Sequence, residues 1–277
     1  MTVTPDPIAA TPPRQTPQDK AAPGALLARA LDAGVLTLTL GRAPAHPLSH
    51  DMIREMHRAL DAAAADPAVR VIVLHGPGHI FCAGHDLKEI ARHRADGDQG
   101  AAYLQTLFDD CAAMMLALAR HPKPTIALVE GIATAAGLQL VASCDMAFAA
   151  RSARVCLPGI NNGGFCTTPA VAVSRVTGRR RVMELALSGE TLDARWAEAA
   201  GLFTRVLPDD QVIDGCMAFA TRLASRNPGP IQAGKAALDA HLARQLEDAY
   251  AMATPVMIGH FMDEGRLAAE RDSPFGG

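Results

Sequence analysis

The sequence FCAGHDLKE at residues 81–89 is the segment from which the fold is most readily inferred. An apolar run at residues 71–74 precedes it, and a turn containing glycine and proline at residues 76–78 separates the two. Asp86 is placed to begin a helix. A buried strand, a glycine-containing turn and a helix start leave consecutive backbone N–H groups without carbonyl partners. Such a place can bind an anion, or an oxygen that becomes negative during a reaction.

A second segment with the same features lies at residues 131–145. It begins as a loop, is predicted to become a helix over residues 135–143, and precedes a predicted strand at residues 146–150. Either segment by itself is more often structural than functional, because a strand, a turn and a helix in succession are common. Two of them in one chain give the prediction of a functional site more weight.

The rest of the chain alternates between strand and helix patterns, which indicates a mixed α/β fold. Residues 35–40 alternate in hydrophobicity and predict a strand. Ser49 is expected to cap a helix that ends at residues 66–67. Residues 69–75 are apolar enough for a strand covered on both faces, and residues 125–129 predict another strand. Further helices are expected from residue 86 and at residues 99–120, 169–177, 179–187, 193–200, 212–225 and 230–257, with a loop at residues 157–165.

The composition restricts the class of protein. The chain has 277 residues, of which 49% are hydrophobic, so it can fill a sizeable core. A net charge of −3 shows no excess of basic residues of the kind that binds nucleic acid. No apolar run approaches the roughly 20 residues that span a bilayer. The six cysteines show neither CxxC pairing nor metal-ligand spacing with histidine, so reduced, packed thiols in a cytoplasmic protein are expected.

One domain preceded by a tail is predicted. Residues 1–24 are polar and rich in proline and threonine, which is typical of a flexible segment and not of a secretory signal. Residues 25–200 are assigned to the α/β core, and residues 201–277 to a helical C-terminal region of the same domain. The last helices have more apolar positions than one core face needs. We therefore expect contact with other copies of the chain, with internal packing as the simpler alternative.

Several segments, in this order and spacing, resemble the crotonase superfamily, the enoyl-CoA hydratase/isomerase family. Residues 81–89 are similar to its F-x-A-G-x-D-[IL]-x-E segment, and residues 123–131, KPTIALVEG, to its K-P-[VT]-I-A-x-V-x-G strand. Residues 133–145 are similar to its A-x-G-G-G-x-x-L-x-x-x-C-D helix, with alanine in place of two glycines. Later motifs of the family match residues 188–194, 197–202 and 206–208, and residues 161–169, NNGGFCTTP, are closest to one branch of it.

The resemblance implies an α/β fold, a crotonase-like spiral of ββα units with a helical C-terminal trimerisation region. It also implies that the thioester oxygen of an acyl-CoA lies between the backbone N–H groups of His85 and Ala136. Two such hydrogen bonds stabilise a developing enolate. Coenzyme A enters as part of the substrate, so neither a separate cofactor nor a metal is expected. By the same correspondence, the residues expected to bind substrate and CoA are Ala83, Gly84, Asp86, Leu87 and Gly137.

Two positions depart from the family pattern. The glutamates with which the family's hydratases position and activate water correspond to Gln139 and Gly159 here. The amide of Gln139 can hold a water but has no useful basicity, and Gly159 offers only backbone. Standard hydration at a high rate is therefore not expected. His85 is the alternative acid/base candidate, since an unperturbed imidazole titrates near neutrality, although a ring that faces solvent or a CoA phosphate is the simpler reading.

Other polar residues near these positions have simpler structural explanations. Asp86 is expected to cap the helix that it begins, and Asn161 and Asn162 to form a turn in a glycine-rich loop. Cys166 has no histidine near it in sequence, which favours a packed thiol over a nucleophile. Asp145 is expected to close a helix–strand junction.

The sequence thus predicts an acyl-CoA-binding member of this family, a lyase or isomerase of fatty-acid or related acyl-CoA metabolism. It is expected to form a homotrimer or a dimer of trimers, without nucleic acid or a membrane as partner. Two alternatives stay open. One is a double-bond isomerase or a thioesterase acting on acyl-CoA, and the other is a non-catalytic acyl-CoA binder or assembly subunit.

Overall fold

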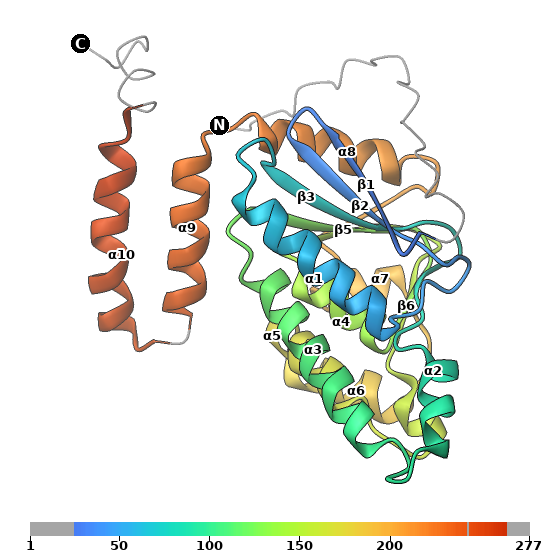
Figure 1. Ribbon diagram of the computed structural model, residues 1–277. Helices are drawn as coiled ribbons and strands as arrows, with labels where there is room; N and C mark the ends of the chain where they lie inside the picture. Colours follow the sequence, from blue (N-terminus) through green and yellow to red (C-terminus); the bar gives the residue numbers. More distant parts are fainter. Residues whose placement is uncertain (1–24, 243, 265–277) are drawn as a thin grey trace, which may run out of the picture.

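The computed structural model describes residues 25–242 and 244–264, and its strands form two sheets (Figure 1). In the larger sheet the order is β1-β2-β3-β5-β7-β10. The first two strands pair antiparallel, and all other neighbours are parallel. The strands are β1 (Leu27–Asp32), β2 (Val35–Leu40), β3 (Val71–Gly76), β5 (Thr125–Val129), β7 (Met146–Ala150) and β10 (Arg205–Leu207).

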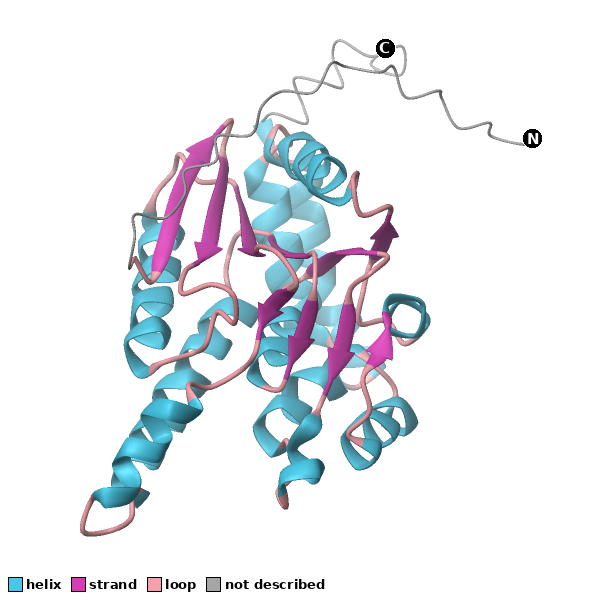
Figure 2. Cartoon of the chain, turned by 90° about the vertical axis from the view of Figure 1, so that its right-hand side faces the viewer, coloured by secondary structure: helices cyan, strands magenta, loops and turns pink. Residues whose placement is uncertain are grey.

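The smaller sheet has the order β4-β6-β8-β9, and Figure 2 shows it beside the larger one. Its strands are β4 (Ile80–Cys82), β6 (Ile132–Thr134), β8 (Arg154–Cys156) and β9 (Leu192–Asp193). The first three are parallel, and β9 runs antiparallel to β8. The sequence did not predict these strands, because segments of 2 or 3 residues are too short for a periodic pattern.

The two sheets alternate along the chain, and this produces a spiral. Each of β3, β5 and β7 in the larger sheet is followed directly by β4, β6 or β8 in the smaller one, and a helix follows each pair. The predicted crotonase-like arrangement of ββα units is therefore confirmed. Its consequence for the site is that the turns after β4 and β6 meet, because these two strands are hydrogen-bonded neighbours.

Helices cover both faces of the larger sheet. In Figure 1, α8 lies on one face, and α1, α3 and α4 lie on the other side. The first helix begins as predicted, with Oγ of Ser49 accepting a hydrogen bond from the N–H of Met52. The helices of the body are α1 (His50–Ala65), α2 (Leu87–Arg92), α3 (Ala101–Ala119), α4 (Ala136–Ser143), α5 (Thr167–Val176), α6 (Arg179–Ser188), α7 (Ala194–Ala199) and α8 (Val212–Ala224).

The core consists mainly of aliphatic side chains. Strand β3 is buried except at His75, which confirms that it is covered on two faces, and β5 is buried along its whole length. All six cysteines are free and buried, as expected for packed thiols. Within the described residues, no helix is long and apolar enough to cross a membrane.

Residues 157–165 are more ordered than expected. A 3-10 helix, η2 (Pro158–Asn162), occupies most of this segment, and Gly163 ends it in the left-handed conformation with φ 74°. The prediction of a loop without regular structure was wrong here. The glycine content that suggested it serves instead to end the helix.

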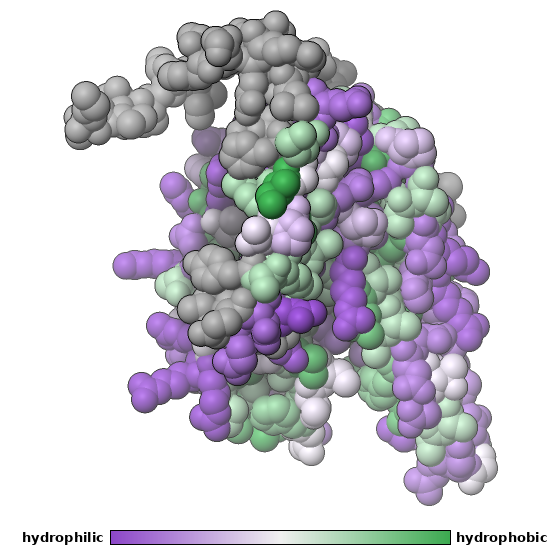
Figure 3. Space-filling model, turned by 90° about the vertical axis from the view of Figure 1, so that its left-hand side faces the viewer, coloured by the Kyte–Doolittle hydropathy of each residue, from purple (hydrophilic) through white to green (hydrophobic). Residues whose placement is uncertain are grey.

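The C-terminal helices form a hairpin that projects from the body (Figure 1). The predicted single helix over residues 230–257 is wrong, because the chain turns back after α9 (Pro228–His241) into α10 (Leu246–Phe261). Folding back lets the two helices pack on one another, with Gly234 close to the ring of His260. Figure 3 shows this side of the molecule, where apolar groups lie among polar ones. The exposed apolar residues of the hairpin are Leu238, Leu242, Met257, Ile258 and Met262.

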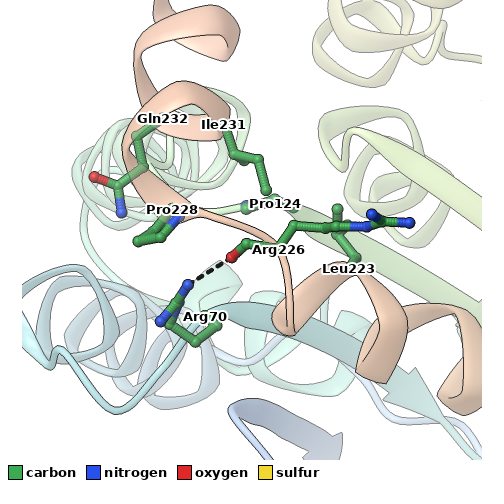
Figure 4. Close-up of a pocket in the computed structure, with 7 residues that line it drawn as sticks. All are labelled: Arg70, Pro124, Leu223, Arg226, Pro228, Ile231 and Gln232. Atoms are coloured by element: carbon green, nitrogen blue, oxygen red, sulfur yellow. Dashed lines mark hydrogen bonds between the residues drawn. The ribbon is translucent and has the colours of Figure 1, made fainter. Parts of the chain in front are cut away.

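A small crevice marks the root of the hairpin (Figure 4). Nη2 of Arg70 donates to the carbonyl oxygen of Arg226 at 2.7 Å. Asn227 caps α9 through its Oδ1 and donates to Asp263 from its Nδ2. The crevice thus belongs to the attachment of the hairpin. The predicted tail at residues 1–24 and the end of the C-terminal region at residues 265–277 lie outside the described residues.

Candidate active site

The two glycine-containing segments singled out in the sequence meet at Gly84 and Ala136. Gly84 has φ +89°, and a Cβ placed on it would lie 3.2 Å from the backbone nitrogen of Ala136 and 3.0 Å from Cβ of Ala135. An L side chain is strained at that φ and has no room there. Glycine is therefore required for the turn after β4 to approach the first turn of α4 this closely.

The backbone N–H of His85 is free because of how the neighbouring backbone pairs. Leu48 donates to the carbonyl oxygen of Gly84 at 2.8 Å, and its own carbonyl oxygen accepts from Asp86 at 3.1 Å. These two hydrogen bonds form a parallel bridge that uses the residues on either side of His85 and leaves the N–H of His85 unused. Among the hydrogen bonds of the described residues, none takes the N–H of His85 as donor.

The backbone N–H of Ala136 is free for a different reason. Ala136 is the first residue of α4, and the first N–H groups of a helix have no intrahelical acceptor. Ala135, the residue before it, has φ 51° and ψ −122° and makes no side-chain cap. No hydrogen bond within the described chain uses the Ala136 N–H. Two unpaired donors, from His85 and Ala136, thus flank the contact between Gly84 and α4.

The remaining residues predicted to bind CoA have visible structural roles. Oδ1 of Asp86 caps α2 by accepting from the N–H groups of Lys88 and Glu89, as expected, and its Oδ2 lies 3.0 Å from Nη2 of Arg42. Packing requires glycine at position 137, because a Cβ there would lie 2.1 Å from the carbonyl oxygen of Cys82. A CoA-binding role for Asp86 and Gly137 stays a prediction.

Two of the predicted CoA-binding residues are on the surface. Leu87 is 72% exposed at the start of α2. Ala83 is also exposed, and its N–H donates to the carbonyl oxygen of Ala45 at 2.9 Å. Their contact with CoA likewise stays a prediction, and both are accessible to a ligand that approaches the turn from outside.

The His85 side chain points inward, which changes its expected chemistry. Its ring meets that of Phe108 on α3 edge-to-face, with 5.1 Å between centroids. Burial lowers the pKa of His85 from 6.5 to about 4, so the ring is neutral at pH 7. The expectation that His85 titrates near neutrality was therefore wrong. The contact with Phe108 joins residues far apart in sequence, and no local pattern signals it.

Gln139 and Gly159 occupy the positions where the resemblance places two glutamates. Gln139 is 6% exposed on α4, and its Oε1 has no hydrogen-bond partner among the described residues. The N–H of Gly159 donates to Sγ of Cys166 at 3.2 Å, and a Cβ on Gly159 would lie 2.8 Å from the backbone nitrogen of Cys166. This part of the site therefore has a thiol and backbone where a carboxylate would be needed.

The other candidates have structural roles, although Asn161 lies in η2 and not in the turn that was expected. Burial raises the pKa of the Cys166 thiol, which disfavours the thiolate form that acts as a nucleophile. Nδ2 of Asn161 donates to the carbonyl oxygen of Gly189 at 2.9 Å and holds two loops together. Asp145 joins the end of α4 to β5, since its Oδ2 accepts from the N–H of Thr125 at 2.8 Å. The described part of the chain contains no cluster of potential metal ligands.

Comparison with known proteins identifies the family. The sequence profile of the enoyl-CoA hydratase/isomerase family matches residues 30–272. This chain belongs to the enoyl-CoA hydratase/isomerase family. The motif-based prediction of that family from the sequence is thereby confirmed.

The relatives of this enoyl-CoA hydratase/isomerase family member agree with the branch that residues 161–169 indicated. It is 36% identical over 211 residues to the mitochondrial enoyl-CoA hydratase domain-containing protein 3 of Rattus norvegicus, covering 76% of this chain and 69% of the relative. It is also 34% identical over 209 residues to 2,3-dehydroadipyl-CoA hydratase of Escherichia coli K12, covering 74% of this chain and 78% of the relative.

Solved structures of the same family superpose on this one. An enoyl-CoA hydratase/isomerase family protein from Silicibacter pomeroyi has a TM-score of 0.83 at 60% identity, covering 86% of this chain and 99% of that one. Human enoyl-CoA hydratase domain-containing protein 3 has a TM-score of 0.82 at 31% identity, covering 88% and 94%.

Proposed function

We propose that this protein binds an acyl-CoA thioester with the thioester oxygen between the N–H groups of His85 and Ala136. The observation that carries the proposal is the close contact of Gly84 with Ala136, which places two unpaired backbone donors at one point. An oxygen held there would gain two hydrogen bonds as it becomes negative, and one such donor is worth about 2.7–4 kcal/mol in other enzymes. The chemistry that this arrangement favours is formation of an enolate from the thioester.

Standard hydration fits the site poorly. Hydration needs a group that takes a proton from water and returns one to the substrate. Gln139 is an amide, Gly159 has no side chain, and burial lowers the pKa of His85 to about 4, which makes its neutral ring a weak base. We therefore propose slow or absent hydration. Double-bond migration through the enolate is the activity proposed in its place, with a bound water accepting the proton from one carbon of the substrate and returning it to another.

A non-catalytic acyl-CoA binder is the second candidate. It is favoured by the absence of a charged group at pH 7 at Gln139, Gly159 and His85. In either case CoA is part of the ligand, and no further cofactor is proposed. The exposed apolar residues of the α9–α10 hairpin support the proposal that copies of the chain associate, as a trimer or a dimer of trimers in the cytoplasm.

Mass spectrometry of butyryl-CoA and crotonyl-CoA incubated with the protein in deuterated water tests these proposals. Deuterium uptake without hydration is expected for enolate chemistry, and free CoA would indicate thioester hydrolysis. Bound but unchanged thioester would favour the non-catalytic binder. Brisk hydration of crotonyl-CoA would contradict the assignment of Gln139 and Gly159. Loss of the deuterium uptake in a folded Ala136→Pro variant would assign it to the Ala136 N–H, because proline has no backbone N–H.

A further inference from the structure

Two buried polar atoms near the proposed oxyanion site have no hydrogen-bond partner. They are Nε2 of His85 and Oε1 of Gln139, and neither finds an acceptor or donor within the described chain. Buried polar side-chain atoms are nearly always hydrogen-bonded, because leaving one unpaired is costly. A pair of them beside a proposed ligand site indicates that the ligand itself completes their hydrogen bonding.

The two residues belong to the region where α3 packs against α4, since Gln139 is on α4 and the His85 ring contacts α3. The His85 ring contacts Phe108 on α3. Further along α3, Sδ of Met115 accepts a hydrogen bond from Oγ of Ser143 on α4 at 3.6 Å. The intervals from Phe108 to Met115 and from Ala136 to Ser143 are equal, about 10 Å of helix each. The two helices are therefore packed against one another here.

Gln139 follows Ala136 on the same face of α4, because residues three apart in a helix are neighbours. An acyl-CoA held by its thioester oxygen at the N–H of Ala136 would therefore extend its acyl chain past Gln139. The His85 ring belongs to the residue that supplies the other N–H, so it borders the same stretch of the chain. The first few carbon atoms beyond the thioester would meet both orphaned polar atoms.

The chemistry of the two atoms defines the group that would satisfy them. Oε1 of Gln139 is an acceptor only, so its partner must be a donor. Nε2 of His85 donates or accepts according to the tautomer of the neutral ring. A hydroxyl is both a donor and an acceptor and can bond to both. A hydrocarbon chain would leave both atoms unpaired, and an ionised carboxylate has no proton to donate to Oε1 of Gln139 and would find no positive charge on either side chain.

We propose that His85 and Gln139 form an uncharged polar subsite that recognises a hydroxyl group on the acyl chain, within a few atoms of the thioester. This inference rests on the proposed function, since it requires an acyl-CoA to bind at the His85 and Ala136 N–H groups. Neither side chain is basic enough to deprotonate the hydroxyl, and both therefore act as specificity-determining residues. Their neutrality also makes the preference constant between pH 6 and 9, about 2 pH units or more above the His85 pKa of about 4.

Isothermal titration calorimetry with butyryl-CoA and with 2-, 3- and 4-hydroxybutyryl-CoA tests the proposal. At least one hydroxylated thioester is expected to bind about tenfold more tightly than butyryl-CoA, as two added hydrogen bonds would give. Gln139→Met and His85→Phe preserve side-chain size and the His85 backbone N–H, and each should reduce the preference to about twofold. Thr177→Val is the matched control, because it removes a buried unpaired hydroxyl at the end of α5 and should keep the preference.

The outcomes separate the two proposals. Equal affinity for butyryl-CoA and all three hydroxylated thioesters would overturn the hydroxyl subsite and leave the acyl-CoA site intact. A preference that survives in both Gln139→Met and His85→Phe would also overturn it. Failure of all four thioesters to bind would overturn the proposed function and this inference together. If either variant does not fold, the comparison of the four ligands on the unmodified protein still decides the matter.

Discussion

The backbone N–H of Gly159 donates a hydrogen bond to Sγ of Cys166 at 3.2 Å, and this contact fills the space where the family's second glutamate would begin. A Cβ at residue 159 would lie 2.8 Å from the nitrogen and 3.0 Å from Sγ of Cys166. Gly159→Ala is therefore expected to destabilise the protein by about 1–3 kcal/mol, the usual cost of overpacking. Chemical denaturation measures the loss.

Gly164→Ala is the matched control for this substitution. A Cβ at Gly164 would have its nearest contact at 3.7 Å, an ordinary van der Waals distance. Its effect on the free energy of unfolding should stay within about 0.5 kcal/mol, as for most exposed sites. Equal losses in the two variants would show that the contact with Cys166 does not restrict residue 159.

The same crowding predicts that restoring both glutamates will not restore hydration. The variant Gln139→Glu/Gly159→Glu is expected to raise crotonyl-CoA hydration by less than about tenfold, whereas well-placed acid–base groups contribute roughly 10²–10⁴-fold. The second carboxylate can enter only if the backbone around Cys166 moves. Loss of the enoyl absorbance measures the rate, and a gain of a hundredfold or more would contradict the prediction.

Gly84→Ala should weaken acyl-CoA binding and stability together. Alanine at φ +89° is strained, and its Cβ would crowd the Ala136 nitrogen that the proposal places next to the thioester oxygen. We expect a loss of about 1–3 kcal/mol in the free energy of unfolding. Gly78→Ala is the control, because Gly78 has φ +88° with nothing within 4 Å. If both variants lose equal stability and both bind acyl-CoA normally, the contact with Ala136 has no role in the site.

The sequence predicted those parts of the fold and site that depend on local chemistry. The caps at Ser49 and Asp86 follow from side-chain oxygens that precede helices, and both were found. The meeting of the turn at Gly84 with α4 followed from the family resemblance. The burial of the His85 ring did not follow from either, because it involves contacts with another helix, such as the one with Phe108 on α3.

The misses share a physical cause. The smaller sheet and the α9–α10 hairpin depend on packing between segments, and the residues around 242–245 contain neither glycine nor proline to signal a break. The crowding at Gly159 likewise comes from Cys166 across a loop. Local propensity carries no information about such contacts.

The buried imidazole of His85 should make stability depend on pH. Burial lowers its pKa from 6.5 to about 4, so the unfolded chain binds more protons than the native protein between these values. Stability is therefore full above about pH 6.5 and falls as the pH decreases towards 4, by at most about 3 kcal/mol from this residue. Denaturant unfolding of the protein and of His85→Phe between pH 7.5 and 4.5 should show a shallower dependence in the variant. His57→Phe is the control, and its stability should depend on pH as that of the unmodified protein does. An equal pH dependence of stability in the unmodified protein and in His85→Phe would show that His85 is not desolvated in the native state.

The attachment of the C-terminal hairpin should depend on one ion pair. Nζ of Lys235 on α9 contacts Oδ1 of Asp145, whose other oxygen accepts from Thr125 in β5. The side chains of the pair are 12% and 27% exposed, so it is less screened by water than a surface pair. Lys235→Met keeps the aliphatic stem and removes the charge.

We expect Lys235→Met to lower the free energy of unfolding by about 1–2 kcal/mol and to speed hydrogen exchange in α9 more than in β5, since it removes the cation beside a partly buried carboxylate. Arg181→Met is the control, because Arg181 pairs with Glu184 at an exposed site within α6, where about 0.5 kcal/mol or less is expected. Equal effects of the two substitutions on stability, with unchanged exchange in α9, would show that the hairpin is held by its apolar contacts and not by Asp145.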